Sequence, residues 1–284
     1  MDISILSAMI NIANNPIHSL QYIYISKNRA NSMGEALEMY IKDIFANTIN
    51  ETSEIKRNQR YNQVFSYLGN QNNPPDIIIS NGDAIEVKKI ESKNSGIALN
   101  SSYPKAMLYS DSQMITEACR TCENWTEKDI IYAVGVVNDN QLKSLCFIYG
   151  IDYAASSNIY ERIKNAISTG ILSIPDIEFS ETNELGRVNR VDPLGVTYLR
   201  IRGMWHIQNP MKTFSYIYNE NQNSSFNFMA IINDNKYKSF GIESRKKFED
   251  ELKKNNNFNM VDVKIKEPDN PSILRGAKLI TFSV

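Results

Sequence analysis

The strongest constraint on the fold comes from residues 76–90, where two β-branched runs, DIIIS and AIEVKKI, are separated only by Asn-Gly-Asp. An Asn-Gly-containing link between such runs is a strong signal for an antiparallel β-hairpin. Side chains alternate along a strand, so Glu86 and Lys88 share one face while Val87 points to the core. If the first run pairs back through the turn, Asp76 lies beside them. The segment therefore predicts three charged groups at one point of a hairpin.

Two carboxylates and an ammonium group in this arrangement are suited to metal-assisted hydrolysis of a phosphodiester. Carboxylate oxygens are ligands for Mg²⁺, and bound Mg²⁺ polarises a phosphate and acidifies an attacking water. Asp76 and Glu86 are therefore the candidate metal ligands. Lys88 can neutralise charge that develops on the phosphate oxygens or help to position the water. The alternative is a solvated, non-catalytic hairpin face; Lys89 should point the other way.

The remaining pattern predicts alternating helices and strands. Apolar residues at helical spacing predict helices at 2–14, 32–48, 112–125, 156–169 and 243–254. Ser32 and Glu35 predict a capping box at the start of the second helix. Apolar or alternating runs predict further strands at 130–137, 144–150, 197–205, 228–232 and 278–284. This order predicts an α/β fold with a mixed central β-sheet flanked by helices.

Composition narrows the class of protein. The longest apolar run, Ile130–Val137, has eight residues, whereas a helix that spans a bilayer needs about 20. The first residues carry no basic segment typical of a signal peptide. Three cysteines are too few for a disulfide framework, so we expect a reducing cytoplasm. Cys119 and Cys122 form one CxxC pair, but structural zinc usually needs two such pairs, and we expect no metal there.

The net charge is −1, yet positive charge is concentrated in one stretch. Between Gly186 and Lys212, five cationic side chains stand against one acid, Asp192, a local net charge of +4. Arginine is the best reader of guanine, because it donates two hydrogen bonds to O6 and N7. The candidate DNA-binding residues in this stretch are Arg187, Asn189, Arg190, Arg200 and Arg202.

Strand alternation should place Arg200 and Arg202 on one face, whereas Arg187 and Arg190 should lie in a loop after Gly186. The alternative is a solvated basic face, or ion pairs with Glu178, Glu181 and Glu184. A second polar segment, Leu99–Lys105, combines small hydroxyls, an amide and a lysine. Such groups suit phosphate or base-edge contacts, and we select Asn100 and Lys105. A turn rich in turn-forming residues is the alternative.

The PD…EVK pattern resembles the PD-(D/E)xK nuclease signature. Longer segments, among them NRANSMGEALEMYIKDIFA, FSYLGNQNNPPDIIISNGDAIEVKKIES and ELGRVNRVDPLGVTYLRIRGMW, resemble the NgoPII-type family of type II restriction endonucleases, from about residue 5 to about residue 215. The resemblance implies Mg²⁺-dependent double-strand cleavage of DNA at a short GC-rich palindrome, GGCC. It implies that Asp76 and Glu86 bind the metal and that Lys88 is the motif lysine. Glu38, at the edge of the apolar stripe of its helix, fits a further glutamate of such nucleases.

The resemblance also implies the organisation and the partners of the chain. We expect a single domain, 1–284, with a catalytic core at about 30–150 and DNA-recognition elements at about 180–284. A palindrome presents the same pattern on both strands, so we expect a homodimer on double-stranded DNA. A cognate DNA methyltransferase should belong to the same system without being a stable subunit. The alternatives are a structure-specific nuclease and a catalytically inactive DNA-binding protein; the intact Asp76, Glu86 and Lys88 argue against inactivity.

Overall fold

The computed structural model of the chain describes residues 3–17, 19–25, 30, 32–70, 72–180, 182 and 185–284. Its helices, in chain order, are α1 (Ile5–Asn14), the π-helix η1 (Gln21–Ile25), α2 (Met33–Ala46), α3 (Glu54–Val64), α4 (Glu117–Arg120), the 3₁₀-helix η2 (Gly150–Asp152), α5 (Ser157–Leu172), α6 (Pro210–Thr213), α7 (Asp234–Ser239) and α8 (Ile242–Lys254). Within the described part, no helix is both long and apolar enough to cross a membrane.

The strands are β1 (Phe65–Tyr67), β2 (Ile77–Ile79), β3 (Ala84–Ile90), β4 (Ile97–Asn100), β5 (Met107–Tyr109), β6 (Glu127–Asn138), β7 (Gln141–Tyr149), β8 (Glu178–Ser180), β9 (Gly186–Asn189), β10 (Leu199–Ile201), β11 (Trp205–Ile207), β12 (Asn227–Asn233), β13 (Phe258–Lys266) and β14 (Leu274–Ser283). Nine of them form the central sheet, in the order β1-β2-β3-β6-β7-β12-β14-β13, with β5 paired to β6. The β3–β6 and β7–β12 pairs are parallel and the others antiparallel. The predicted α/β class with a mixed sheet is confirmed.

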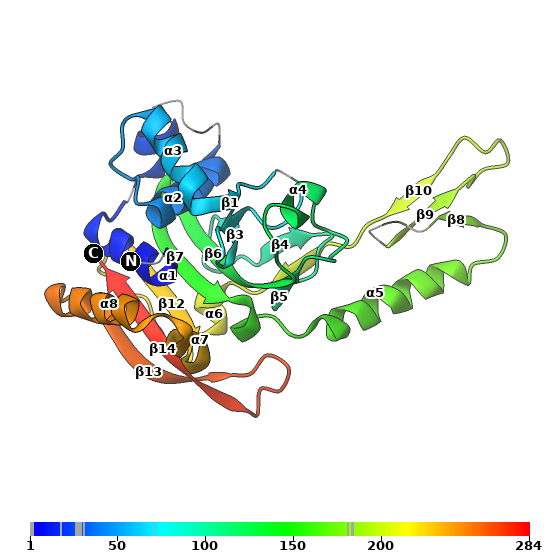
Figure 1. Ribbon diagram of the computed structural model, residues 1–284. Helices are drawn as coiled ribbons and strands as arrows, with labels where there is room; N and C mark the ends of the chain where they lie inside the picture. Colours follow the sequence, from blue (N-terminus) through cyan, green and yellow to red (C-terminus); the bar gives the residue numbers. More distant parts are fainter. Residues whose placement is uncertain are drawn as a thin grey trace.

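Both faces of this sheet are buried, in two separate cores. Helices α1, α2 and α8 cover one face (Figure 1), where they pack against Ile85 of β3 and Phe147 of β7. The other face carries Ala84 and Ile90 of β3 and packs under β4, β5 and α6. Since residues alternate along a strand, Glu86 and Lys88 lie on this second face with Ala84 and Ile90. The burial pattern therefore decides on which side of the sheet the charged residues of β3 emerge.

The hairpin and the second helix form as predicted. Strands β2 and β3 pair antiparallel, with Ile77 opposite Ile85, and Asn81 in the turn has φ 54°. In α2, the Ser32 side chain accepts a hydrogen bond from the Glu35 N–H. The predicted apolar stripe of α2 is buried against the sheet. The predicted helices at 2–14, 156–169 and 243–254 correspond to α1, α5 and α8.

The prediction of a helix over 112–125 is wrong, since only α4, Glu117–Arg120, is helical there. Thr116 caps α4 by accepting from the Cys119 N–H, so the preceding residues cannot continue the helix. After α4, the Thr121 hydroxyl bonds to the Glu117 carbonyl and the Trp125 indole N–H bonds to the Cys119 carbonyl. These side-chain bonds compete with the helical pattern and end the helix after one turn.

An arm projects from the body of the molecule (Figure 1). It consists of α5 and a separate three-stranded antiparallel sheet, ordered β10-β9-β8. The chain returns from the arm through β11, which pairs with β4, so that Trp205 lies opposite Asn100. At the base of the arm, Tyr103 stacks on Tyr160 of α5 with ring centroids 5.3 Å apart, and both rings contact Trp205 edge-on.

Two predictions about this region need correction. Arg187 lies on strand β9, paired with Arg200 of β10, and not in a loop. The predicted strand 197–205 is divided, because β10 ends at Ile201 and the chain then leaves the arm to form β11. Both errors have one physical cause: the pairing partners of these short strands lie far along the chain or beyond a turn, where local periodicity carries no information.

Candidate active site

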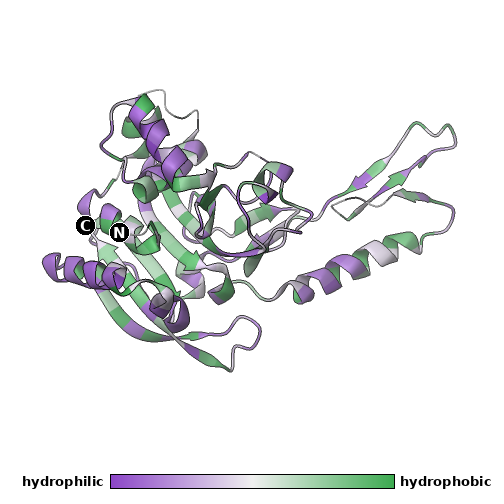
Figure 2. Cartoon of the chain, viewed as in Figure 1, coloured by the Kyte–Doolittle hydropathy of each residue, from purple (hydrophilic) through white to green (hydrophobic). Residues whose placement is uncertain are grey.

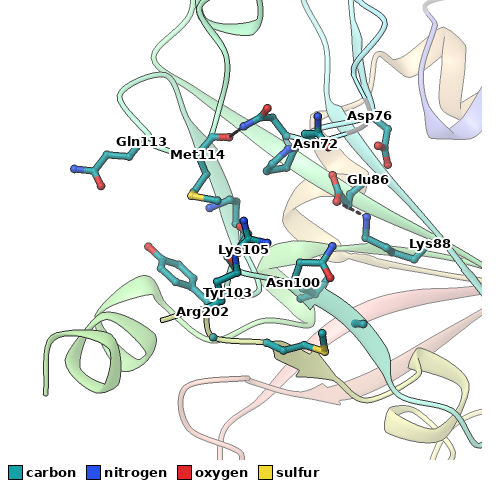
Figure 3. Close-up of a pocket in the computed structure, with 18 of the residues that line it drawn as sticks. Asn72, Asp76, Glu86, Lys88, Asn100, Tyr103, Lys105, Gln113, Met114 and Arg202 are labelled. Carbon is teal, nitrogen blue, oxygen red and sulfur yellow. Dashed lines mark hydrogen bonds and ion pairs between the residues drawn. The ribbon is translucent and has the colours of Figure 1, made fainter. Parts of the chain in front are cut away.

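A cavity of about 800 Å³ opens on the second face of the sheet. Its lining combines the segment before β2, strand β3, strand β4 with the loop after it, part of β6, residues 113–114 and the part of the arm around Arg200 and Arg202. Figure 3 shows Asp76, Glu86 and Lys88 gathered on one side of this cavity, with Lys105 and Asn100 nearby. The three charged groups of the predicted hairpin site therefore do meet, and they meet inside a cavity.

Backbone contacts fix Asp76 at the start of the hairpin. Its N–H donates to the Ile85 carbonyl at 3.1 Å, and its Oδ2 accepts from the Val87 N–H at 2.6 Å. Gly69 allows this close approach, because a Cβ there would lie 2.3 Å from the Asp76 carbonyl oxygen. Burial raises the pKa of Asp76 to about 7; the Glu86 carboxylate adds to the rise, and Lys88 opposes it. Without a bound cation, this carboxyl is therefore protonated in about half of the molecules near neutral pH.

Glu86 and Lys88 are joined side by side on β3. The Lys88 Nζ lies 2.6 Å from the Glu86 Oε1. Burial alone would lower the pKa of Lys88, but the charges of Glu86 and Asp76 together raise it, so the ammonium form is favoured. The second oxygen, Glu86 Oε2, is buried and has no hydrogen-bond partner among the described residues. A buried carboxylate oxygen without a partner is costly unless something else binds it.

Asp76 and Glu86 are the carboxylate donors that the cavity offers to a divalent cation. Within the described ranges, no three His, Cys, Asp or Glu side chains converge tightly enough to bind a metal by themselves. Mg²⁺, however, is usually bound through one or two carboxylates, with waters and substrate phosphates as the other ligands. Asp76 and Glu86, with the unpaired Oε2 of Glu86, fit that mode of binding.

Glu38 does not line the cavity. It lies on α2, which covers the opposite face of the sheet, and its Oε1 is 2.6 Å from the Lys42 Nζ. Its charge still acts on the site, as a minor contribution that raises the pKa of Asp76. Lys89 also points away, and its Nζ lies 3.0 Å from the Glu91 Oε1. The alternation of β3 thus separates Lys88 from Lys89 as predicted.

The loop after β4 forms a second wall that carries Asn100 and Lys105. Asn100 ends β4 with φ 51°. Tyr132 of β6 fixes the backbone of Lys105, since its hydroxyl accepts a hydrogen bond from the Lys105 N–H at 2.7 Å. Burial lowers the pKa of Lys105, and the Glu86 carboxylate opposes this shift. Lys105 therefore lies within electrostatic range of the carboxylate pair.

Sequence reasoning missed Tyr132 and Tyr103, which line the cavity and position the loop. Tyr132 lies in the apolar run of β6, where a buried aromatic residue is unremarkable by pattern. Tyr132 lies opposite Glu86 in the parallel β3–β6 pair. This neighbour could be inferred only if the order of the strands in the sheet were already known. Tyr103 donates from its hydroxyl to Glu161 of α5 at 2.7 Å, a contact between segments far apart in sequence.

Two arginines of the arm reach the cavity, and a third lies on the same face of the arm sheet. Arg200 and Arg202 line the cavity. Arg187 lies opposite Arg200 in the β9–β10 pair, and Asn189, two residues on, shares its face. The Arg187 guanidinium lies over the Tyr198 ring, 4.0 Å from its centroid.

Arg190 differs from the other predicted arginines. It follows β9 with φ 47°, and its Nε lies 3.5 Å from the Glu178 Oε2. This is one of the ion pairs weighed as an alternative to DNA contact. The other two acids considered, Glu181 and Glu184, lie outside the described residues.

The cysteines lie away from this cavity. Cys119 and Cys146 are buried, Cys122 is half-buried, and all three are free thiols. Burial raises the pKa of the Cys119 thiol to about 12, which leaves it protonated at neutral pH. The cavity lining, by contrast, holds the acids and lysines.

A mixed α/β sheet with an acid at the start of a hairpin, Glu-x-Lys on its second strand and an adjoining basic wall defines the class of PD-(D/E)xK, restriction-endonuclease-like nucleases. The family model described as NgoPII restriction endonuclease matches residues 3–266. The type II restriction enzyme NgoPII of Neisseria gonorrhoeae is 53% identical over 280 residues, 98% of this chain and 99% of that protein. The chain belongs to the NgoPII restriction endonuclease family and is a type II restriction endonuclease, a site-specific deoxyribonuclease. No solved structure matches the chain.

Proposed function

We propose that this endonuclease makes Mg²⁺-dependent double-strand cuts in DNA at a short GC-rich palindrome, GGCC. The observation that carries the proposal is the cavity in which Asp76, Glu86 and Lys88 meet opposite Arg200 and Arg202. Metal-dependent cleavage of DNA needs a bound cation, a positive group near the phosphate that is cut, and side chains that bind the DNA. This cavity combines groups suited to all three.

In this proposal, Asp76 and Glu86 are the metal ligands. Bound Mg²⁺ would supply Lewis acidity toward the phosphate and toward the attacking water. Lys88, kept charged by its two acidic neighbours, faces the phosphate and offsets the negative charge that grows on its oxygens. Glu38 is proposed as a further catalytic glutamate; it lies outside the cavity lining, but its charge acts on both Asp76 and Lys88.

DNA contacts are proposed on both walls of the cavity. Lys105 and Asn100, which line the cavity, are proposed to bind a phosphate of the DNA backbone. Arg187, Asn189, Arg200 and Arg202 share the side of the arm that leads into the cavity, and we propose them as readers of guanine or as phosphate clamps. Arg190, with its acidic partner Glu178, is proposed as a peripheral phosphate contact.

The assembly in this proposal is a homodimer on double-stranded DNA. One chain has one Asp76–Glu86–Lys88 set, so two copies related by a two-fold axis would cut the two strands of a palindrome. We propose that the enzyme acts in the cytoplasm, with a DNA methyltransferase in the same system that protects the host sites without forming a stable complex.

The test is digestion of a plasmid of known sequence by the purified protein, followed by sequencing of the ends. We expect fragments that end at GGCC in Mg²⁺, no cutting in EDTA and recovery when Mg²⁺ is restored. Cuts at another sequence would contradict the proposed site but not the chemistry. Cutting that persists in EDTA would contradict the metal.

A further inference from the structure

Helix α5 has an apolar stripe that is exposed at its middle and half-buried at its ends. None of its sixteen residues, all of which the structure describes, is buried. Ile159, Ile163, Ile167 and Ile171 follow one another at spacings of four residues, which places them along one side of the helix. Ile163 and Ile167 are 42% and 43% exposed. Figure 2 shows apolar residues recurring along α5 as it leaves the body.

The polar side of α5 has a different neighbour. Glu161 and Asn165 line a second cavity, which shares Tyr103 and Lys105 with the active-site cavity. Ile163 is two residues from each, and two residues correspond to a rotation of about 200° around a helix of 3.6 residues per turn. The apolar stripe therefore faces away from the cavity that continues the active site.

The three-stranded sheet of the arm is divided in the same way. Val188 lies opposite Leu199 on one side and opposite Phe179 on the other, so these three side chains share a face. Val188, at the centre, is buried. The other face carries Arg187 and Arg200, which are also opposite each other. Leu199 is 54% exposed. Each part of the arm thus has a polar side that leads to the active site and an apolar side that does not.

The amount of exposed apolar surface is large for a monomer. Of the nineteen large apolar residues that are exposed among the described residues, ten lie between Ile163 and Met204. Two of these belong to the polar side, since Tyr198 lies under the Arg187 guanidinium and Met204 lines the active-site cavity. The other eight are about half exposed, and at roughly 100 Å² for each fully exposed aliphatic side chain they offer several hundred Å². A stable protein interface buries about 800 Å² on each partner, whereas large apolar patches are uncommon on monomers.

The chemistry of the arginine face and the apolar face indicates which partner covers the apolar side of the arm. DNA presents an array of phosphates and would be covered by the arginine face, but it offers no cover for a row of isoleucines. A two-fold interface brings the same patch of both copies together, and an apolar patch is complementary to itself, whereas a patch of one charge is not. A second copy of this chain also brings the second active site that cutting both strands requires.

We propose that two copies of this chain bind each other through the arm, by the exposed Ile163 and Ile167 of the α5 stripe and by exposed Leu199 on the apolar face of the arm sheet. This inference rests on the proposed homodimer and assigns its interface. Because the arginines occupy the opposite face of the arm sheet, the partner and the DNA do not compete for the same surface. The arm therefore couples dimer formation to the position of the residues that contact DNA.

The test is the mass of the full-length protein in solution, measured by light scattering without DNA or metal. The wild-type protein should have twice the 32.4 kDa of one chain. The double variant Ile163→Glu/Ile167→Glu should raise the dimer dissociation constant at least about 100-fold, as expected when central apolar contacts are lost. The matched controls are Ile55→Glu and Ile242→Glu, since these isoleucines are 72% and 76% exposed on α3 and α8; both should remain dimers.

Two further variants protect the test against misfolding of the arm. Ile163→Gln/Ile167→Gln retains good helix-forming residues, and Leu199→Gln addresses the sheet independently; both should weaken the dimer while the circular dichroism spectrum stays unchanged. On a plasmid with Mg²⁺, the weakened dimers should accumulate nicked circles where the wild type produces linear DNA.

A wild-type protein that is monomeric at tens of micromolar would overturn the inference, as would arm variants that dimerise like the wild type. The mass measurement involves no cleavage. A dimer that is broken by the arm variants but cuts at some other sequence would therefore refute GGCC and leave the interface standing.

Discussion

At the scale of single residues, the environment of Asp76 decides how the site behaves. Its carboxyl is held between the Val87 N–H and the Glu86 carboxylate in a buried position. Burial makes the carboxyl a poor free anion, and in the proposed site a bound cation would relieve both the desolvation and the repulsion from Glu86. Four predictions belong to this scale.

The first prediction concerns the hairpin triad. Asp76→Ala, Glu86→Ala and Lys88→Ala should each lower cleavage by at least about 1,000-fold, as expected when a metal ligand or a charge-stabilising group is lost. Lys89→Ala is the matched control and should cut nearly as fast as wild type, because Lys89 pairs with Glu91 on the other side of the strand. The measurement is plasmid linearisation in Mg²⁺. Equal losses from Lys88→Ala and Lys89→Ala would contradict the assignment.

The second prediction concerns pH. Because the pKa of Asp76 is raised to about 7 in the folded protein, the folded state holds a proton between about pH 4 and pH 7 that the unfolded chain releases. The stability of the metal-free protein should therefore fall, through this group, as the pH rises across that window. Asp76→Asn removes the carboxylate and should have the higher melting temperature at pH 8, with little difference near pH 4.

Saturating Mg²⁺ should reverse this order at pH 8, since it stabilises only the protein that binds it. Exposed Asp111 offers the control, because Asp111→Asn should leave the pH dependence unchanged. A melting temperature of Asp76→Asn below that of wild type at pH 8 without metal would show that the buried carboxylate is stabilised by a partner we have not identified.

The third prediction separates readers of bases from phosphate contacts. Arg200→Ala should weaken binding to the cognate duplex by about 1–3 kcal/mol and to a scrambled duplex by much less. Arg190→Ala should weaken both about equally and lower the salt slope by about one. Binding is measured in Ca²⁺, which usually supports binding without cleavage, at several salt concentrations. If none of the arm arginines alters the ratio of cognate to scrambled binding, recognition lies elsewhere on the chain.

The fourth prediction concerns Lys105. Lys105→Ala should weaken DNA binding on cognate and scrambled duplexes alike, because a lysine beside the carboxylate pair is placed to meet a phosphate and not a base. Lys143→Ala, on β7 and outside the cavity lining, is the control and should leave binding unchanged. A loss confined to the cognate duplex would assign Lys105 to base reading instead.

At the scale of secondary-structure elements, close backbone contacts between strands and loops hold the second wall of the cavity in place. The clearest is Gly150, the first residue of η2, where a Cβ would lie 2.3 Å from the Lys105 carbonyl oxygen and 2.7 Å from that of Ala106. A backbone contact cannot be relieved by a change of rotamer, so the loop itself would have to move. The position of Lys105 thus depends on the absence of one methyl group from a neighbouring element.

We therefore predict that Gly150→Ala destabilises the protein by about 1–3 kcal/mol, the usual cost of overpacking, and lowers the cleavage rate by displacing the loop. Gly170→Ala provides the control, because no atom lies within 4 Å of a Cβ there. In the last turns of α5, that change should stabilise the helix by up to about 1 kcal/mol. Urea unfolding and cleavage rates measured on both variants test this. Unaltered cleavage by Gly150→Ala would show that the loop adapts.

At the scale of the whole molecule, the central sheet combines strands from the first half of the chain with strands from its C-terminal part. Strand β12 lies between β7 and β14, and β13 closes the edge, so residues 227–283 complete the scaffold that carries the hairpin. Within the region from 180 onward that we expected to serve recognition, only the arm carries the candidate DNA-binding residues. Helix α8 also covers the N-terminal helices, with Phe248 in their common core.

Much of this arrangement was determined by the sequence itself. The Asn-Gly turn and the alternation of β3 are local properties, encoded within fifteen residues, and they suffice to bring Asp76, Glu86 and Lys88 together. The same is true of α2, whose cap and apolar stripe are short-range patterns. Turn chemistry and periodicity act between neighbours in the chain, and for this reason they can be read without knowing the rest of the structure.

Only the tertiary structure decided what lies opposite the hairpin. Asn100 and Trp205 are paired through β4 and β11, and this pairing delivers Arg200 and Arg202 to a cavity whose acids come from the first third of the chain. The separation of the arm into an arginine face and an apolar face depends on which short strands pair and in what register. Such pairings gain their free energy from contacts between distant segments, so no local pattern records them. The proposed catalytic group is therefore a property of one hairpin, whereas the proposed DNA-binding surface is a property of the whole fold.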